Sequence, residues 1–114
     1  MQREADIMDI IVNGGDARSS CLKAVRCARN GQIEEADELI KRAEKALEKA
    51  HNVQTSLIQA EIRGEKNEIT LLMVHAQDHL MNAITVKELS IELIEECKKR
   101  RELEEKLKGM INND

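Results

Sequence analysis

Two histidines and an aspartate stand together in VHAQDHLM, residues 74–81, in a chain that has only three histidines. His75 and His79 are four residues apart, so on a helix their side chains share one face. Such a pair could chelate a transition metal, as in the H-E-x-x-H motif of zinc hydrolases. Here Ala76 replaces the glutamate that serves as general base, and no third ligand follows at motif spacing. A hydrolytic zinc site is therefore not expected.

The second chemistry open to His75 is nucleophilic. A neutral imidazole can attack a phosphoryl group and hold it as a labile phosphoramidate, without any cofactor. The phosphoryl oxygens then need donors, and the candidates nearby are Gln77, His79 and Asn82. Gln77 lies on the opposite side of a helix from His75, so it would reach that group only from an adjacent subunit. The alternative is a helical oligomeric scaffold in which the histidines are incidental.

The composition predicts the elements that must position these side chains. The 114-residue chain has no proline and no aromatic residue, and 35% of its residues are charged. This mixture favours helix over strand, so we expect one all-α domain over residues 1–114. A net charge of −4 and the lack of aromatic residues argue against binding of nucleic acid, which needs a basic face and stacking platforms.

The cysteines and the hydropathy pattern indicate the compartment. Cys21, Cys27 and Cys97 are an odd number without a C-x-x-C pair, and they are expected to be small core residues in a reducing environment. No apolar run approaches the roughly 18 residues of a membrane span, and the acidic N-terminal stretch does not resemble a signal peptide. We therefore expect a cytoplasmic protein without direct membrane insertion.

Glycines divide the helical pattern into three segments. Asn30-Gly31 and Arg63-Gly64 mark positions where a left-handed residue commonly ends a helix. A kink or turn is also expected at Gly14-Gly15, and the charged C-terminal stretch should be solvated. Short connections favour an antiparallel three-helix bundle. The expected helices are about 3–29, 32–62 and 68–108.

The third expected helix carries apolar residues on two faces. The face that should pack on the other helices consists of Ile69, Met73, Ala76, Leu80, Ala83 and Ile84. The second face has the spacing of a coiled-coil seam and consists of Leu71, Val74, Asp78, Met81 and Thr85. A monomer does not need it, so we expect it to pack against copies of itself. If several Asp78 carboxylates meet there, they need protons or a hard cation such as Mg²⁺ to offset their repulsion. The equally simple alternative is that Asp78 lies at a solvated edge of the bundle.

Three segments carry a family resemblance: VHAQDHLM, GDARS at residues 15–19 and AHNVQT at residues 50–55. Together they closely resemble the enzyme IIA component of the lactose/cellobiose (chitobiose) branch of the bacterial phosphoenolpyruvate-dependent sugar phosphotransferase system. The resemblance implies a cytoplasmic, homotrimeric phosphocarrier of three-helix subunits. It would accept a phosphoryl group from HPr on a histidine and pass it to a cysteine of enzyme IIB during uptake of a β-linked disaccharide (cellobiose, chitobiose or lactose).

The resemblance also implies roles for four residues of the motif. It makes His75 the phosphoryl acceptor, and so implies a phosphotransferase component with a phosphohistidine intermediate. It places Asp78 on the trimer axis as ligand of one divalent cation per trimer, usually Mg²⁺. Gln77 and His79 match the motif as well and are assigned to supporting the phosphoryl group. The motif form with Ala76 is closer to the cellobiose and chitobiose members than to the lactose members.

Three further polar residues have structural interpretations. Arg18 falls on the apolar stripe of the first expected helix, where it should form an ion pair with a carboxylate. His51 and Gln54 should form hydrogen bonds between helices. None of the three is expected to take part in phosphoryl transfer.

Overall fold

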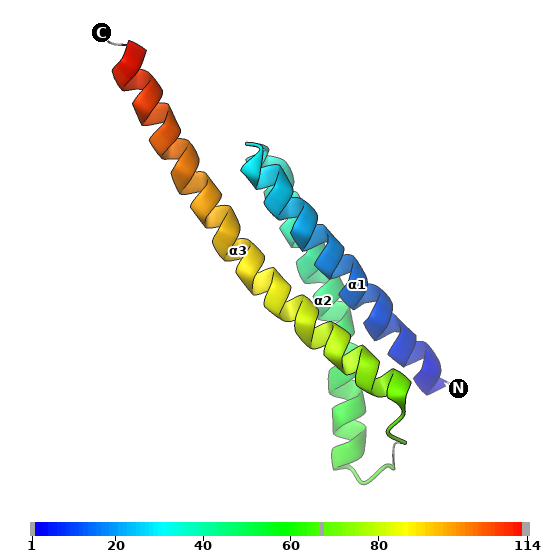
Figure 1. Ribbon diagram of the computed structural model, residues 1–114. Helices are drawn as coiled ribbons and strands as arrows, with labels where there is room; N and C mark the ends of the chain where they lie inside the picture. The colour runs from blue at the N-terminus through cyan, green and yellow to red at the C-terminus, as the bar shows by residue number, and fades with distance from the viewer. Residues whose placement is uncertain (1, 67, 113–114) are drawn as a thin grey trace.

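The computed structural model describes residues 2–66 and 68–112, which form three α-helices. α1 (Gln2–Arg29) and α2 (Ile33–Ile62) form an antiparallel hairpin, and α3 (Leu71–Asn112) returns beside them, parallel to α1 (Figure 1). The molecule is a rod of 73 × 20 × 20 Å. No strand occurs among the described residues, and the predicted all-α three-helix bundle is confirmed.

Glycine ends the first two helices, as the sequence predicts. Gly31 and Gly64 have φ angles of 86° and 87°, in the left-handed region. At the end of α1 the Gln32 N–H donates to the Cys27 carbonyl at 2.8 Å, and the Gly31 N–H donates to the Ala28 carbonyl at 3.1 Å. This pair of bonds satisfies carbonyls that the last helical turn leaves open, and it requires a left-handed residue. Two equivalent bonds close α2.

Both ends of α3 lie later in the chain than expected. The Thr70 hydroxyl accepts a 3.1 Å hydrogen bond from the Met73 N–H, and this cap starts the helix at Leu71 instead of residue 68. Ile69, which was expected to pack on the other helices, therefore precedes α3 and is 81% exposed. At the other end the helix continues to Asn112, through the charged stretch.

α1 is a continuous helix through Gly14 and Gly15, so the turn expected there is absent. The reason is the close approach of α3. A Cβ atom added to Gly14 would lie 3.7 Å from the Cα atom of Leu80, so the missing side chain brings the two backbones together. Packing against α3 offsets the low helix propensity of the two glycines.

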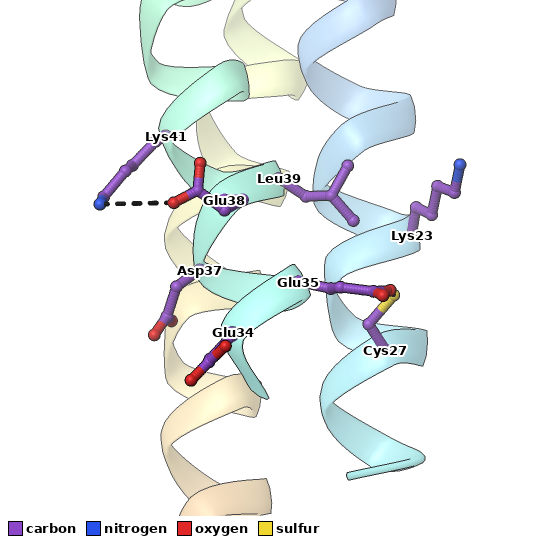
Figure 2. Close-up of a pocket in the computed structure, with 8 residues that line it drawn as sticks. All are labelled: Lys23, Cys27, Glu34, Glu35, Asp37, Glu38, Leu39 and Lys41. Atoms are coloured by element: carbon purple, nitrogen blue, oxygen red, sulfur yellow. Dashed lines mark hydrogen bonds and ion pairs between the residues drawn. The ribbon is translucent and has the colours of Figure 1, made fainter. Parts of the chain in front are cut away.

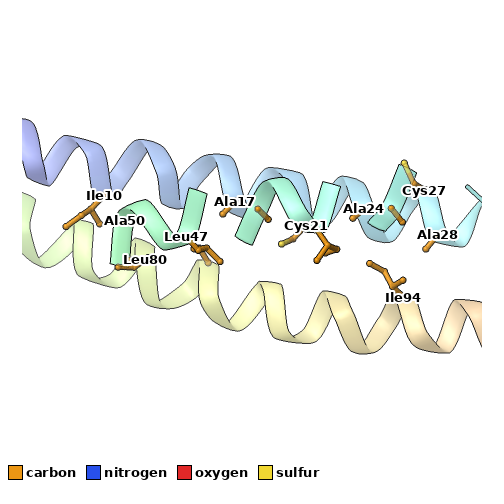
Figure 3. Close-up of a cluster of buried hydrophobic side chains, with 14 of the residues drawn as sticks. Ile10, Ala17, Cys21, Ala24, Cys27, Ala28, Leu47, Ala50, Leu80 and Ile94 are labelled. Atoms are coloured by element: carbon orange, nitrogen blue, oxygen red, sulfur yellow. The ribbon is translucent and has the colours of Figure 1, made fainter. Parts of the chain in front are cut away.

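The core is a narrow column of alanine and aliphatic side chains shared by the three helices (Figure 3). Ile10, Cys21 and Leu80 are its largest fully buried side chains. The following alanines are also fully buried: Ala17, Ala24, Ala28, Ala36, Ala43, Ala50, Ala76 and Ala83. Such small residues let helices approach closely, so a core without aromatic residues can still be well packed.

Two polar contacts fix α3 along the hairpin. The Lys98 ammonium lies 3.5 Å from the Asp37 carboxylate of α2, and the Arg100 guanidinium donates to the Arg29 carbonyl of α1 at 2.9 Å. Beyond these contacts α3 extends past the α1–α2 turn (Figure 1), and every residue from 101 to 112 is exposed. The bundle therefore ends near residue 100 while the helix does not.

Candidate functional site

The second apolar face of α3 is exposed, as the seam pattern predicts. Leu71 is 85% exposed, and Val74 and Met81 are both 52% exposed. Asp78 and Thr85 of the same face are exposed as well. We call these five residues the α3 stripe. α1 and α2 cover only the opposite side of the helix, so the stripe is free to bind another surface.

Asp78 lies at the middle of the α3 stripe. The Asn82 amide donates to its carboxylate at 3.4 Å, one helical turn away. Over residues 2–66 and 68–112 no three His, Cys, Asp or Glu side chains converge on a common point. A single chain therefore offers a cation one hard carboxylate donor at this position, and further copies of Asp78 would have to supply the others.

His75 and His79 form a stacked pair at the border of the α3 stripe. Their ring centroids are 5.7 Å apart and the ring planes differ by 23°. His75 is exposed, whereas His79 is half-buried and lines a small surface pocket of about 270 Å³ with Arg18, Asn82 and Thr85. An exposed imidazole beside a held one is suited to accept a group from a partner protein.

The half-buried position of His79 depends on α1. A Cβ atom added to Gly14 would lie 3.3 Å from Cδ2 of His79, and one added to Gly15 would lie 3.2 Å from Nε2. One edge of the imidazole thus rests on the two glycines. From the sequence alone, these glycines predict only a kink or turn in the first helix. An adjacent glycine pair inside a helical pattern was the available signal, because it often marks close packing.

Gln77 points away from the histidines. Its amide oxygen accepts a 2.5 Å hydrogen bond from the Gln54 amide of α2, which confirms the predicted helix–helix role of Gln54. Gln77 is therefore not brought to His75 within one chain, and its support of a phosphoryl group stays a prediction that needs an adjacent copy. His51 is exposed and makes no hydrogen bond to another side chain in the described part of the chain.

Arg18 does not form the expected ion pair. Among the described residues no carboxylate lies within ion-pair distance of its guanidinium. The buried face of α1 is centred on Ile10, Ala17 and Ala24, so Arg18 falls at its edge and remains exposed. It lines the pocket beside His79 instead. The structure thus places the Arg18 guanidinium next to the candidate site, whereas the sequence predicts a structural ion pair.

Another surface hollow lies between the second half of α1 and the first turns of α2 (Figure 2). It has a volume of about 630 Å³, four of its eight lining residues are carboxylates, and the Cys27 sulfur lies 3.8 Å from Glu35. None of the site residues predicted from the sequence lines it. Burial raises the pKa of the nearby Cys21 thiol, which keeps it protonated near neutral pH. Cys21 and Cys27 are buried and serve as core residues, as predicted.

Comparison with known proteins decides the family. The model of the lactose/cellobiose-specific IIA subunit of the phosphotransferase system (PTS) matches residues 5–98, which include the histidine pair and Asp78. The chain belongs to this family. Members of the PTS IIA family are phosphotransfer proteins, so this IIA component is a phosphotransfer protein and not merely a scaffold. None of its helices, over the described residues, is long and apolar enough to cross a membrane.

Individual relatives agree with the family model. The IIA chain is 53% identical over 94 residues to the lichenan-specific phosphotransferase enzyme IIA component of Bacillus subtilis, covering 82% of this chain and 86% of the relative. It is similar to the crystal structure of the cellobiose-specific enzyme IIA from Bacillus anthracis, with a TM-score of 0.86, 50% identity and coverage of 89% and 93%. It also resembles the IIA(Chitobiose) solution structure, solved as a complex with HPr from the Escherichia coli system, with a TM-score of 0.75, 38% identity and coverage of 86% and 95%.

Proposed function

We propose that His75 is the phosphoryl acceptor of this IIA component. The observation that carries the proposal is the exposed His75 ring, stacked on His79 at the border of the uncovered α3 stripe. An acceptor that must meet two proteins in turn has to be accessible, and it needs a neighbour that fixes its surroundings. His51 is also exposed, but it has no such neighbour in the described structure.

The reaction is a transfer between nitrogen and sulfur nucleophiles. A ring nitrogen of neutral His75 attacks the phosphorus of phospho-HPr; the new P–N bond forms as the P–N bond to the HPr histidine breaks, and that imidazole leaves. A cysteine thiolate of enzyme IIB then attacks the same phosphorus and releases His75. The transferring group spreads negative charge over its oxygens, so catalysis depends mainly on position and on nearby donors.

His79 and Asn82 are the candidate donors on the same side of α3 as His75. His79 is held beside the acceptor ring, and Asn82 lies one turn further along α3, where it already donates to Asp78. Gln77 would add a donor from an adjacent subunit, because in its own subunit it bonds to Gln54. The transfer centre is thus proposed to form between two copies of α3.

A homotrimer along the α3 stripe is the assembly that fits this requirement. The stripe leaves apolar side chains in water on every subunit, and its three-four spacing is that of a coiled-coil seam. Asp78 of each subunit would then meet at the axis, where Mg²⁺ suits the oxygen donors and would neutralise the facing carboxylates. The cation's proposed contribution is structural.

The proposed partners and substrate class follow from the relatives. The chitobiose relative was solved in complex with HPr, which supports HPr as the donor here, and enzyme IIB is the acceptor in the general arrangement of the system. The names of the relatives include cellobiose- and chitobiose-specific components. We propose a cytoplasmic carrier for uptake of a β-linked disaccharide of the cellobiose, chitobiose or lactose type.

The direct test is the intact mass of the protein after incubation with phosphoenolpyruvate, enzyme I and HPr. The proposal predicts a gain of one phosphoryl group per subunit. The group should be lost when the phosphorylated protein is separated from the donors and mixed with an excess of a cognate enzyme IIB. The modification should be labile to acid and heat, as a phosphoramidate is. An unchanged mass with active enzyme I and HPr would overturn the proposal.

Val74→Glu tests the assembly. Three glutamates would meet at the trimer axis beside Asp78, and an uncompensated buried charge costs about 3 kcal/mol or more. Association should therefore weaken by about a hundredfold or more, and sedimentation velocity at micromolar concentration should show monomers.

Ile58→Glu is the matched control, because Ile58 is 48% exposed on α2 and receives the same charge outside the stripe. It should sediment as the wild type does. A Val74→Glu protein that remains trimeric would show that the stripe is not the interface.

A further inference from the structure

We infer that the Gly14–Gly15 step of α1 is a positioning element of the transfer centre, which sets the location of the His79 ring beside His75. The inference rests on the proposed function, in which His75 carries the phosphoryl group. It assigns to two backbone positions of α1 a role in chemistry that otherwise falls entirely on α3. Gly14 and Gly15 are separated from His79 by more than sixty residues of sequence.

The two glycines leave space for the His79 ring, and at Gly15 the ring is the only neighbouring group among the described residues. Within 4 Å of a Cβ atom added to Gly15 lies a single group, the Nε2 atom of His79 at 3.2 Å. Gly14 is different, since its added Cβ atom would meet the ring at 3.3 Å and also the Leu80 backbone at 3.7 Å. Gly14 therefore serves the approach of the two helices as well, whereas Gly15 makes room for the imidazole alone.

The contact with Gly14 and Gly15 determines which ring nitrogen of His79 faces away from α1. Cδ2 and Nε2 face the glycines, and Nδ1 is the ring atom opposite the bond that joins them. Nδ1 is consequently the nitrogen of His79 directed away from α1. With the two rings stacked at 5.7 Å, a small rotation of His79 about its side-chain bonds would move Nδ1 relative to any group on His75.

Helix energetics indicate that the glycines serve contacts outside α1. Alanine is the better helix former at any interior position, so two adjacent glycines weaken α1 for no local benefit. Gly109 provides the comparison within the chain, because it lies in the exposed part of α3 and nothing lies within 4 Å of an added Cβ atom. An alanine at Gly109 would meet no neighbour; one at Gly15 would push His79.

Gly15→Ala is the test. The added methyl group must displace the ring by a few tenths of an ångström, and such misplacement should slow phosphoryl transfer from phospho-HPr by about tenfold in rapid-quench measurements. The thermal midpoint should stay level or rise, because alanine favours the helix. In the unphosphorylated protein the NOEs from the His79 ring protons to the His75 ring and to α1 should change, which an effect confined to helix propensity would not cause.

Two further proteins make the result specific. Gly109→Ala should match the wild type in transfer rate and in the NOEs of both histidine rings. In a His79→Ala background, Gly15→Ala should cost no additional rate, because the ring that the methyl group displaces has been removed.

Wild-type rate and unchanged ring NOEs in Gly15→Ala would overturn the inference, and so would an equal loss of rate in the His79→Ala background. If the wild type accepts no phosphoryl group, the proposed function fails instead. The NOEs still decide the inference in that case, because they need no transfer.

Discussion

Replacement of His75 by alanine should abolish phosphoryl acceptance and leave the fold intact. Without the imidazole no nitrogen remains to form the phosphoramidate, so intact mass after incubation with phosphoenolpyruvate, enzyme I and HPr should show no gain. The side chain is exposed, so its removal should change the free energy of unfolding by no more than about 0.5 kcal/mol. Circular dichroism and sedimentation should match the wild type.

The other two histidines provide the controls. His51→Ala removes an exposed histidine from α2 and should be phosphorylated at the wild-type rate. His79→Ala keeps the acceptor and loses a donor, so it should still reach full modification, but about tenfold to a hundredfold more slowly. A phosphorylated His75→Ala protein would mean that another residue is the acceptor. Loss of assembly in that variant would mean that His75 is buried at an interface and not at its border.

Substitution of Asp78 by leucine should abolish metal binding and leave the trimer in place. The change removes the only carboxylate of the α3 stripe and adds an apolar group to a seam that is otherwise mostly apolar. Replacement of buried ions by apolar residues of similar volume is often neutral or stabilising, by up to about 4 kcal/mol. Metal content measured by mass spectrometry should fall to zero, while sedimentation shows an unchanged or tighter trimer.

Asp9→Leu is the control for this experiment, since Asp9 is an exposed aspartate of α1 outside the stripe. It should keep the wild-type metal content. Dissociation of Asp78→Leu into monomers would show that the cation is required for assembly. Full metal content in Asp78→Leu would place the cation on other ligands.

The two predictions separate two roles that the motif combines. His75 and Asp78 are three residues apart, yet one lies at the border of the stripe and the other at its middle. The Asp78→Leu protein should therefore still accept a phosphoryl group, because the stacked pair of His75 and His79 is unchanged. Loss of phosphoryl acceptance in an Asp78→Leu protein that is still trimeric would show that the cation contributes to the transfer centre as well.

The helix ends illustrate how far local sequence information reaches. Glycine predicts helix ends at Gly31 and Gly64, because few other residues adopt a positive φ angle readily. Both glycines do have a positive φ angle. The apolar pattern begins at Ile69, so it predicts a start of α3 near residue 68. The structure starts the helix three residues later, because the Thr70 hydroxyl caps it. A cap is a single hydrogen bond, and periodicity alone does not reveal it.

Contacts between distant segments explain where the structure differs from the sequence predictions. Helix propensity predicts a kink or turn at Gly14 and Gly15, because it counts only the cost of glycine and not the packing of α3 on that surface. Arg18 was expected to pair with a carboxylate, whereas it lines the pocket of His79 across from α3. Neither contact has a signature in the spacing of residues along one helix.

The sequence alone is enough to predict the helical class, the division into three helices, the two faces of α3 and the motif that holds His75 and Asp78. These features follow from local helix propensity and from the helical spacing of apolar residues, both of which depend on residues close together in the chain. Three other features come from the tertiary fold alone: Gln77 bonds to Gln54, Arg18 lines the pocket of His79, and His79 rests on α1. Those features depend on which surfaces meet when helices far apart in the chain pack, and helical periodicity leaves that choice open.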